Sequence, residues 1–243
     1  MTVISFGGGV NSTALVLEMV RRGEPFDAAI FVDLQAERPA VYENIGLVSK
    51  WLEERGAPGI TIIKSQPQTC GNDVAESLEQ ECMMRRTLPG LAYGYRTCSA
   101  KWKVRPFYKY LDQIGASEAT VCIGFDASEW HRAERNNYLN KRFPLIEWDI
   151  DRDECRKIIR NSGLPEPEKS SCFFCPATRL PEVLSLKCKH PNLFSRAIAI
   201  ERNAELITVK GLGRRFSWEW AAERDANQLD LSLGMETPCA CMD

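Results

Sequence analysis

The sequence lacks an apolar run long enough to cross a bilayer, so it predicts no membrane-spanning helix and no membrane partner. It also has little net charge. The 31 basic and 33 acidic side chains leave −2, which gives no whole-chain signal for nucleic-acid binding but leaves a local basic groove open. It shows no internal repeat and no low-complexity tract. No signal peptide precedes the first expected strand at residue 3, so we expect a cytoplasmic protein.

Hydrophobic residues and cysteines are well represented. Hydrophobic residues make up 44% of the 243 positions, enough for one large domain or a domain with an appendage. The chain has ten cysteines, and in a reducing compartment these indicate metal or redox chemistry before disulfides. Cys122 lies in an apolar run and Cys155 on a helical stretch, so we interpret both as small buried hydrophobic residues.

Strand and helix patterns alternate through the first half. Short apolar runs at 3–6, 28–32, 60–63 and 120–123 predict strands, and helical periodicity follows at 12–22, 39–55 and 101–114. Near-continuously apolar strands separated by helices predict an α/β domain with a doubly wound parallel sheet over residues 1–150. Ligands of such sheets bind beyond the carboxyl ends of the strands.

The pattern becomes helical from residue 151, where Asp151 and Glu154 have capping-box spacing. Further helices are expected near 180–187 and 192–203. We therefore predict a second, mostly helical unit over residues 151–243, which contains a Cys-X-X-Cys pair and a cysteine-bearing tail. The segment 66–97 fits neither period and is interpreted as a loop or a lid over the site.

A glycine-rich loop follows the first strand. Glycines let backbone N–H groups approach a phosphate, and the helix that begins after them adds a dipole and unsatisfied donors. Ser12 and Thr13 can donate hydroxyl hydrogen bonds. The alternative is a tight turn that only packs the strand on the helix. The loop lacks the lysine ending of a Walker-type loop and is no dinucleotide fingerprint. Its residues are Ser5-Phe6-Gly7-Gly8-Gly9-Val10-Asn11-Ser12.

This loop resembles the PP-loop signature, Ser-Gly-Gly-X-Asp-Ser, of ATP pyrophosphatases. That superfamily, with its adenine nucleotide alpha hydrolase-like fold, includes sulfonucleotide reductases, tRNA thiolation enzymes and the ATPase component of DNA phosphorothioation. The chain departs from the signature at Asn11, where the family has aspartate. The resemblance implies binding of ATP and Mg²⁺ by the loop, with the cofactor-binding residues Ser5, Gly7, Gly8, Gly9, Asn11, Ser12 and Thr13.

Four further segments resemble the phosphoadenylyl-sulfate-reductase-like branch, of the type found in phages and mobile elements, and occur in the same order. They imply that Asp33 and Gly124 contact the nucleotide and that Lys103 and Arg132, with Asn11, are catalytic. Asp33 has a helix-capping interpretation as well. Ser99 stands where some relatives have a second cysteine, and Asp126 where they have arginine. The segments are residues 31–42, 96–106, 123–133 and 171–176.

Cysteines carry the metal hypothesis. The spacing of Cys172 and Cys175 suits chelation of one metal centre, and thiolates select an iron–sulfur cluster or zinc. The resemblance adds Cys98, and three thiolates then need a fourth ligand or leave one iron of a cluster open. We favour Cys239 and an assignment as a 4Fe-4S cluster. The other candidates for the fourth ligand are Cys241, Cys188 and Cys70.

Three functions are compatible with these patterns. The first is an ATP-dependent enzyme that adenylylates an acceptor, releases pyrophosphate and transfers sulfur to a nucleobase or nucleic acid such as tRNA or DNA. The second is sulfonucleotide reduction with Cys239 or Cys241 as nucleophile and a thioredoxin-type reductant. The third is a zinc-stabilised nucleotide-binding module. A sulfur donor is a further expected partner of the first, and the sequence leaves a homodimer open.

Overall fold

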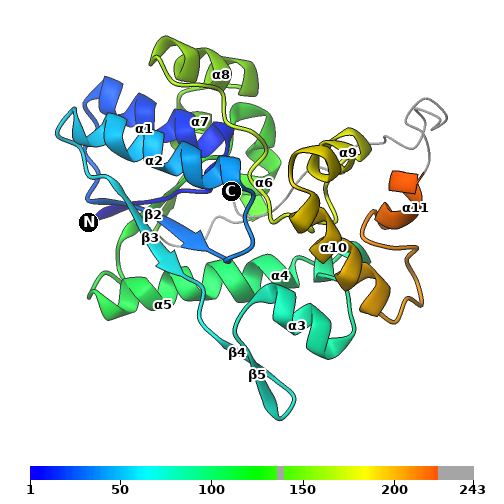
Figure 1. Ribbon diagram of the computed structural model, residues 1–243. Coiled ribbons are helices and arrows are strands. Elements are labelled where there is room, and N and C mark those ends of the chain that lie inside the picture. The colour runs from blue at the N-terminus through cyan, green and yellow to red at the C-terminus, as the bar shows by residue number, and fades with distance from the viewer. Residues whose placement is uncertain (136–139, 224–243) are drawn as a thin grey trace.

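The computed structural model describes residues 1–135 and 140–223, and its centre is a parallel five-stranded sheet (Figure 1). The strand order is β3-β2-β1-β6-β7, and every neighbouring pair is parallel. The strands are β1 (Thr2–Ser5), β2 (Ala28–Asp33), β3 (Ile60–Lys64), β6 (Thr120–Ile123) and β7 (Lys141–Arg142). The predicted α/β fold with a parallel sheet is confirmed, including all four strands expected from the sequence.

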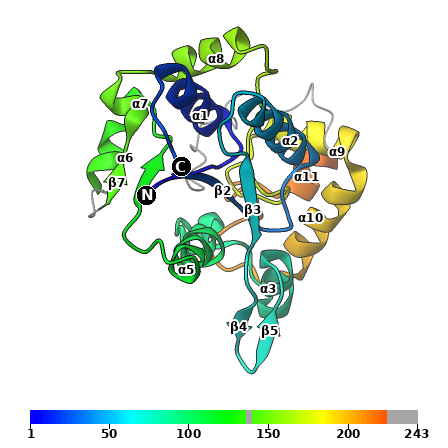
Figure 2. The same cartoon turned by 90° about the vertical axis from the view of Figure 1, so that its left-hand side faces the viewer.

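Helices cover both faces of the sheet, as Figure 2 shows from its edge. Ile4 and Phe31 pack with helices on one face, whereas their neighbours Val3 and Ile30 pack with a helix on the other. Burial on both sides explains why the inner strands β1, β2 and β6 have apolar residues pointing to both faces. The first face carries α1 (Val10–Arg22), α2 (Pro39–Glu53) and α8 (Arg152–Asn161), and the second carries α5 (Arg105–Gln113).

The chain changes direction across the sheet at β1. From β1 it runs outward through β2 to β3, and it later returns to the other side of β1 as β6. The loops after β1 and β6 therefore leave neighbouring strands in opposite directions at a topological switch point, where α/β sheets form ligand crevices.

A third core joins the C-terminal helices to the segment 66–97. Its helices are α9 (Leu180–Lys189), α10 (Pro191–Asn203) and α11 (Trp218–Glu223), and buried Trp218 packs among them. The segment 66–97 contributes the hairpin β4 (Gln68–Cys70) and β5 (Asp73–Ala75), then α3 (Leu78–Arg85), which packs beside α10. This segment is thus folded into a core rather than an irregular loop.

One long helical stretch connects this core to the sheet. After the separate 3₁₀ turn η1 (Gly90–Tyr93), it begins with α4 (Thr97–Ser99), widens into a π-helical turn, η2 (Ala100–Val104), and continues as α5. Short elements surround β7, namely η3 (Ala127–Glu129), α6 (Trp130–Arg135) and α7 (Pro144–Glu147). Across both described stretches of the chain, no helix is long and apolar enough to cross a membrane.

The expected division near residue 150 remains a prediction. The first helix after it, α8, contributes Cys155 and Ile159 to the core that it shares with α1. Cys155 and Cys122 are fully buried there, which confirms their interpretation as small core residues.

Candidate functional site

The glycine loop is fixed by close contacts from α2. Gly8 has φ +76°, and a side chain there would place its Cβ 2.9 Å from Val41 Cγ1. Asn44 donates from Nδ2 to the Gly8 carbonyl oxygen and to Thr13 Oγ1, both at 3.1 Å. A glycine at position 8 is therefore required both by backbone conformation and by space.

The start of α1 closes on the same loop. The Ser12 hydroxyl lies 3.2 Å from both the backbone nitrogen and the carbonyl oxygen of Gly9, so it accepts from one and donates to the other. Ser170, from the segment that leads to the cysteine pair, donates a hydrogen bond to the Gly7 carbonyl oxygen. The loop is thus held between a helix and the segment that carries the cysteines.

Gly124 brings the end of β6 against the same helix terminus. A Cβ at this position would lie 3.1 Å from Ser12 Cα and from its backbone nitrogen. In the structure the close approach at Gly124 is therefore to the backbone of α1. This contact explains a glycine there whether or not a ligand is bound.

Asn11 is buried in a polar network. Its amide group donates to Asp126 Oδ2 at 3.0 Å and to Glu129 Oε2 at 3.2 Å, and its Oδ1 accepts from Arg152 at 2.9 Å. Asn11 and Asp126 are both 1% exposed. Asn11, which departs from the PP-loop signature, and Asp126, which stands where the reductase-like branch has arginine, are thus direct hydrogen-bond partners.

Arg132 belongs to the same network. It forms an ion pair with Glu129, and its guanidinium carbon lies 4.3 Å from the centroid of the Phe125 ring. Asp126 Oδ1 accepts from the backbone nitrogen of Ser128 at 3.0 Å. Arg132 therefore reaches the loop through carboxylates, and its proposed contact with an anionic ligand stays a prediction.

Asp33 forms a turn at the end of β2. Its Oδ1 accepts from the Gln35 backbone nitrogen at 2.6 Å and from the Tyr42 hydroxyl at 2.7 Å. Burial, with the neighbouring Asp33 carboxylate, raises the pKa of Tyr42. The contact to Gln35 is the two-residue turn that aspartate side chains favour, so Asp33 has a structural role.

Lys103 and Glu37 form a buried ion pair between the loop and the cysteines. Lys103 Nζ lies 2.9 Å from Glu37 Oε1, and their side chains are 7% and 0% exposed. Lys103 borders a small cavity with Ser5 and Gly7, and also borders the cavity of the cysteines. One lysine therefore touches both parts of the predicted site.

The cavity on the cysteine side, which we call the cysteine cavity, is lined by Cys98, Cys172 and Cys175, with Lys103 and Ser99. The segment of Cys172 is anchored by an antiparallel bridge between Glu37 and Cys172. A tight turn follows, in which the Cys175 backbone nitrogen donates to the Cys172 carbonyl oxygen at 3.1 Å. The structure thus brings together the three cysteines that the sequence singled out, although they are separated by up to 77 positions.

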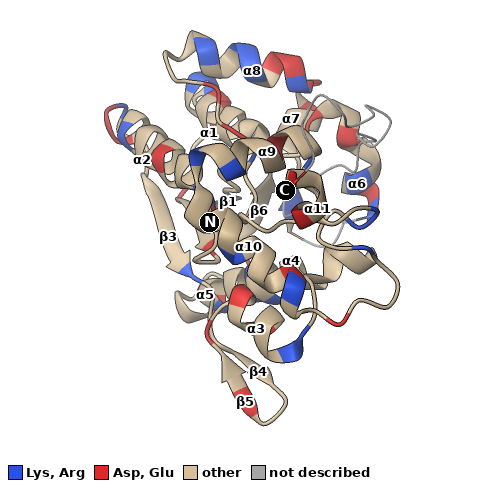
Figure 3. Cartoon of the chain, turned by 45° about the vertical axis from the view of Figure 1, so that its right-hand side comes forward, with Lys and Arg blue, Asp and Glu red and all other residues tan. Residues whose placement is uncertain are grey.

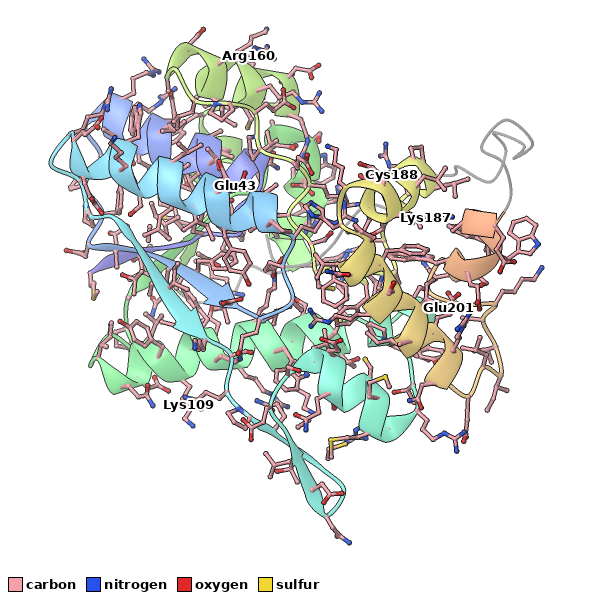
Figure 4. All side chains as sticks on the ribbon, in the orientation of Figure 1. Glu43, Lys109, Arg160, Lys187, Cys188 and Glu201 are labelled. Atoms are coloured by element: carbon pink, nitrogen blue, oxygen red, sulfur yellow. The ribbon has the colours of Figure 1, made fainter. Side chains whose placement is uncertain are left out.

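The three cysteine side chains of this cavity are suitable ligands for a metal centre. Their arrangement, however, does not form a complete metal site. Among the described residues, no three cysteine, histidine or carboxylate side chains lie close enough together to hold a metal. The favoured fourth ligand, Cys239, lies outside the described residues, as does Cys241. Cys188 is exposed on α9 (Figure 4). Cys70 is buried in the third core, and neither cysteine lines the cysteine cavity.

Burial raises the pKa of the Cys98 thiol, and this effect exceeds the opposing effects of backbone hydrogen bonds and of Lys103. A thiol with a raised pKa is protonated at neutral pH, so a metal that binds it must displace a proton.

Sequence patterns did not single out every residue of the site. Asn44, Arg152 and Ser170 contact the loop or its network, yet none of them lies within a segment that was expected to contribute to the site. Glu37 and Asp126 were quoted within motifs but received no role. The hydrogen-bond and ion-pair partners of these residues are known only from the folded structure, because they lie far away along the chain.

Fold and site together define an α/β protein with a glycine-rich loop at the switch point of its sheet and a cysteine-lined cavity beside it. No family model matches the chain. It is similar to the uncharacterized protein MJ0066 of Methanocaldococcus jannaschii, with 22% identity over an alignment of 243 residues in length. This alignment covers 91% of this chain and 46% of the relative. The chain therefore spans about half the length of this curated relative.

Among solved structures, the chain is similar to the U34-tRNA thiolase NcsA from Methanococcus maripaludis with its [4Fe-4S] cluster. The identity is 16% and the TM-score 0.43, and the match covers 89% of this chain and 76% of that one.

Proposed function

We propose that the protein is an ATP-dependent enzyme of the PP-loop type that activates an acceptor by adenylylation and transfers sulfur to it. The acceptor is a nucleobase in a nucleic acid, with tRNA as the first candidate. The observation that carries this proposal is Lys103, which borders both the loop-side cavity with Ser5 and Gly7 and the cysteine cavity. Phosphate chemistry and thiol chemistry would thus meet at one side chain.

The loop would bind the phosphates of ATP. Backbone N–H groups at Gly7 and Gly8 and the N-terminus of α1 would provide donors and a positive dipole end, and Mg²⁺ would share the phosphate charge. Lys103 would stabilise negative charge that develops as pyrophosphate leaves. Glu37 holds the Lys103 ammonium group 2.9 Å away, so it sets the position from which this group acts.

Cys98, Cys172 and Cys175, with Cys239 as fourth ligand, would hold an iron–sulfur cluster, for which the three described thiols must come closer together than they lie in this structure. Such a cluster supplies bound sulfur and redox capacity when present. The residues of this chain contribute the cavity, and neighbouring Lys103 provides a positive charge that partly offsets the rise in the pKa of Cys98 caused by burial.

The cluster is tested by anaerobic purification of the full chain with iron and acid-labile sulfide analysis. We expect iron and sulfide in the parent and in Cys188→Ser, the exposed control, and their loss in Cys172→Ser. Zinc as the metal, without sulfide, would contradict the cluster and favour the zinc-stabilised module instead.

The ATP reaction is tested by pyrophosphate release in the presence of tRNA or DNA. To avoid a buried unpaired carboxylate, Lys103→Met is combined with Glu37→Gln, and we expect a loss of about 10²-fold, typical for removal of one stabilising group. Lys109→Met, on the exposed side of α5, is the control and should keep parental activity (Figure 4). Parental activity in the double variant would refute the role of Lys103.

A further inference from the structure

A second, larger cavity adjoins the cysteine cavity. It has a volume of about 650 Å³, within the range of ligand pockets, and lies between α3 and the segment 87–97, with Thr208 at its border. Figure 1 shows α3 beside α4 and α10, so its walls come from the folded segment 66–97 and the C-terminal core. We call it the α3 pocket.

The two cavities share a wall. Leu78, Pro89 and Cys98 line both the α3 pocket and the cysteine cavity. A molecule in the α3 pocket would therefore meet Cys98 directly, and neither Lys103 nor a residue of the glycine loop lines this pocket. The pocket is placed where a substrate could reach the thiols without crossing the nucleotide loop.

The lining of the α3 pocket combines an apolar floor with hydroxyl groups. Leu78 and Leu88 are buried, and Tyr95 is 67% exposed, so one aromatic ring is available for stacking. An apolar floor, an exposed ring and several hydroxyls suit a flat heterocycle whose edge carries donors and acceptors, and they suit an acyl chain poorly. The hydroxyl-bearing residues are Thr87, Tyr93, Tyr95, Thr97 and Thr208.

The charge of the pocket favours an attached anion. Glu81 forms ion pairs with both Lys101 and Arg85, the latter at 3.3 Å, so two cations face one carboxylate. Trp102 Nε1 also donates to Glu81, at 2.6 Å. On α3 the acidic residues Glu79 and Glu81 lie in the first turn and Arg85 in the last (Figure 3), yet the residues that line the pocket include two cations, Arg85 and Lys101, and one carboxylate, Glu81. This excess suits the phosphate backbone of a nucleotide at the rim.

We propose that the α3 pocket binds a single unstacked nucleobase of the acceptor nucleic acid, with Tyr95 stacking on the base, Arg85 near its backbone and Cys98 at the inner wall. This inference rests on the proposed function, because it identifies where the acceptor enters. Beyond the proposed function, the inference states that the protein binds a base that is no longer stacked on its neighbours, in a single-stranded or looped region.

Binding of labelled oligonucleotides to the anaerobically purified full chain tests this inference without any turnover. The probes are a single-stranded RNA and a DNA of the same sequence, followed by fluorescence anisotropy. Because stacking on an aromatic side chain contributes substantially to binding of a base, we expect Tyr95→Ala to weaken binding at least about fivefold and Tyr95→Phe to preserve it. Tyr108→Ala, on α5, is the control and should bind like the parent.

Arg85→Gln gives an independent readout. We expect it to weaken binding and to lower the salt dependence of the dissociation constant by about one phosphate contact, whereas Arg160→Gln, on α8, should not. The RNA and DNA arms distinguish the two nucleic acids. No binding by the parent, or parental binding by both Tyr95→Ala and Arg85→Gln, overturns the inference. Failure of the proposed function is seen separately, as absent iron or absent pyrophosphate release.

Discussion

Gly8 has the most constrained backbone position of the loop. Its φ of +76° and the 2.9 Å approach to Val41 Cγ1 act together. Gly163, after α8, has φ +77° but nothing within 4 Å of an added Cβ, so it provides a matched control. The pair separates backbone strain from crowding.

We expect Gly163→Ala to lower the free energy of unfolding by about 1–2 kcal/mol, the cost of a left-handed conformation. Gly8→Ala should add a further 1–3 kcal/mol, roughly, because the new methyl group displaces Val41. Urea denaturation measures both. Equal losses in the two variants would mean that the loop yields to the extra carbon atom.

The sequence identified site residues that belong to a local motif. It did not identify contacts between residues that lie far apart along the chain. The departures at Asn11 and Asp126 were visible separately in the sequence, but their hydrogen bond spans 115 positions. Here the Asn11 amide donates to the Asp126 carboxylate, at positions where the patterns that the chain resembles have aspartate and arginine. Only the folded chain reveals that these two residues are in contact.

At the scale of elements, α1 contains a charged cluster that makes a pH-dependent contribution to stability. Glu18 is 1% exposed and accepts from Arg21 Nε and Arg22 Nε, both at 2.6 Å. Burial alone would raise the pKa of Glu18, but the hydrogen bonds from the two arginines outweigh it, and the net pKa is lowered from 4.5.

A lowered pKa in the folded state means that this carboxylate stabilises the fold above pH 4.5 and that the contribution disappears as the pH falls through the folded value. We expect Glu18→Gln to lower the thermal midpoint at pH 7 and to have a smaller effect at pH 3. Thermal melts at both values measure this difference. Glu134→Gln, an exposed carboxylate, controls for the loss of one charge. An equal decrease at both pH values would contradict the argument.

Elements were predictable in proportion to their length and apolar content. The central strands are buried on both faces and therefore appear as continuous apolar runs. The strand β7 has two residues, both basic, and β4 and β5 have three residues each, too few to establish a period. Such short strands form because the surrounding chain presents a partner, which the local sequence does not indicate.

At the scale of the whole molecule, Glu201 on α10 organises the C-terminal core. It is 4% exposed and accepts hydrogen bonds from the backbone nitrogens of Leu212, Trp218 and Glu219, and from Ser217 Oγ, at 2.5–3.1 Å (Figure 4). One carboxylate thus satisfies donors across the segment that leads into α11.

We expect Glu201→Ala to cost about 2–4 kcal/mol, because several donors lose their buried acceptor. Hydrogen exchange should show loss of protection in α9–α11, while the central strands β1 and β2 keep theirs. Glu205→Ala, at an exposed ion pair, should change neither. Equal loss of protection in the sheet would mean that the third core and the sheet unfold as one unit, against the expected division of the chain.

The prediction of the site at this scale rested on cysteines that are distant in sequence. The alternating pattern predicted a ligand site beyond the carboxyl ends of the strands, and the resemblance assigned Gly124 to it. The placement of Cys98 beside Cys172 and Cys175 followed from resemblance alone, since no local period links them. The α3 pocket was not foreseen, because its walls come from a segment without a clear pattern.

The π-helical turn Ala100–Val104 determines how Cys98 and Lys103 are oriented toward the cysteine cavity. In a regular α-helix, residues five apart point about 140° away from each other, whereas a π turn bonds each residue to the fifth along and brings them to the same side. Cys98 and Lys103 are five apart, and both line the cysteine cavity. The π turn therefore has the effect of one residue inserted into an α-helix. A chain with one residue fewer here would keep the fold, but the Cys98 thiol and the Lys103 ammonium group would no longer face the same cavity. The length of this segment, more than its residue identities, is then the feature by which chains with the same chemistry can be distinguished.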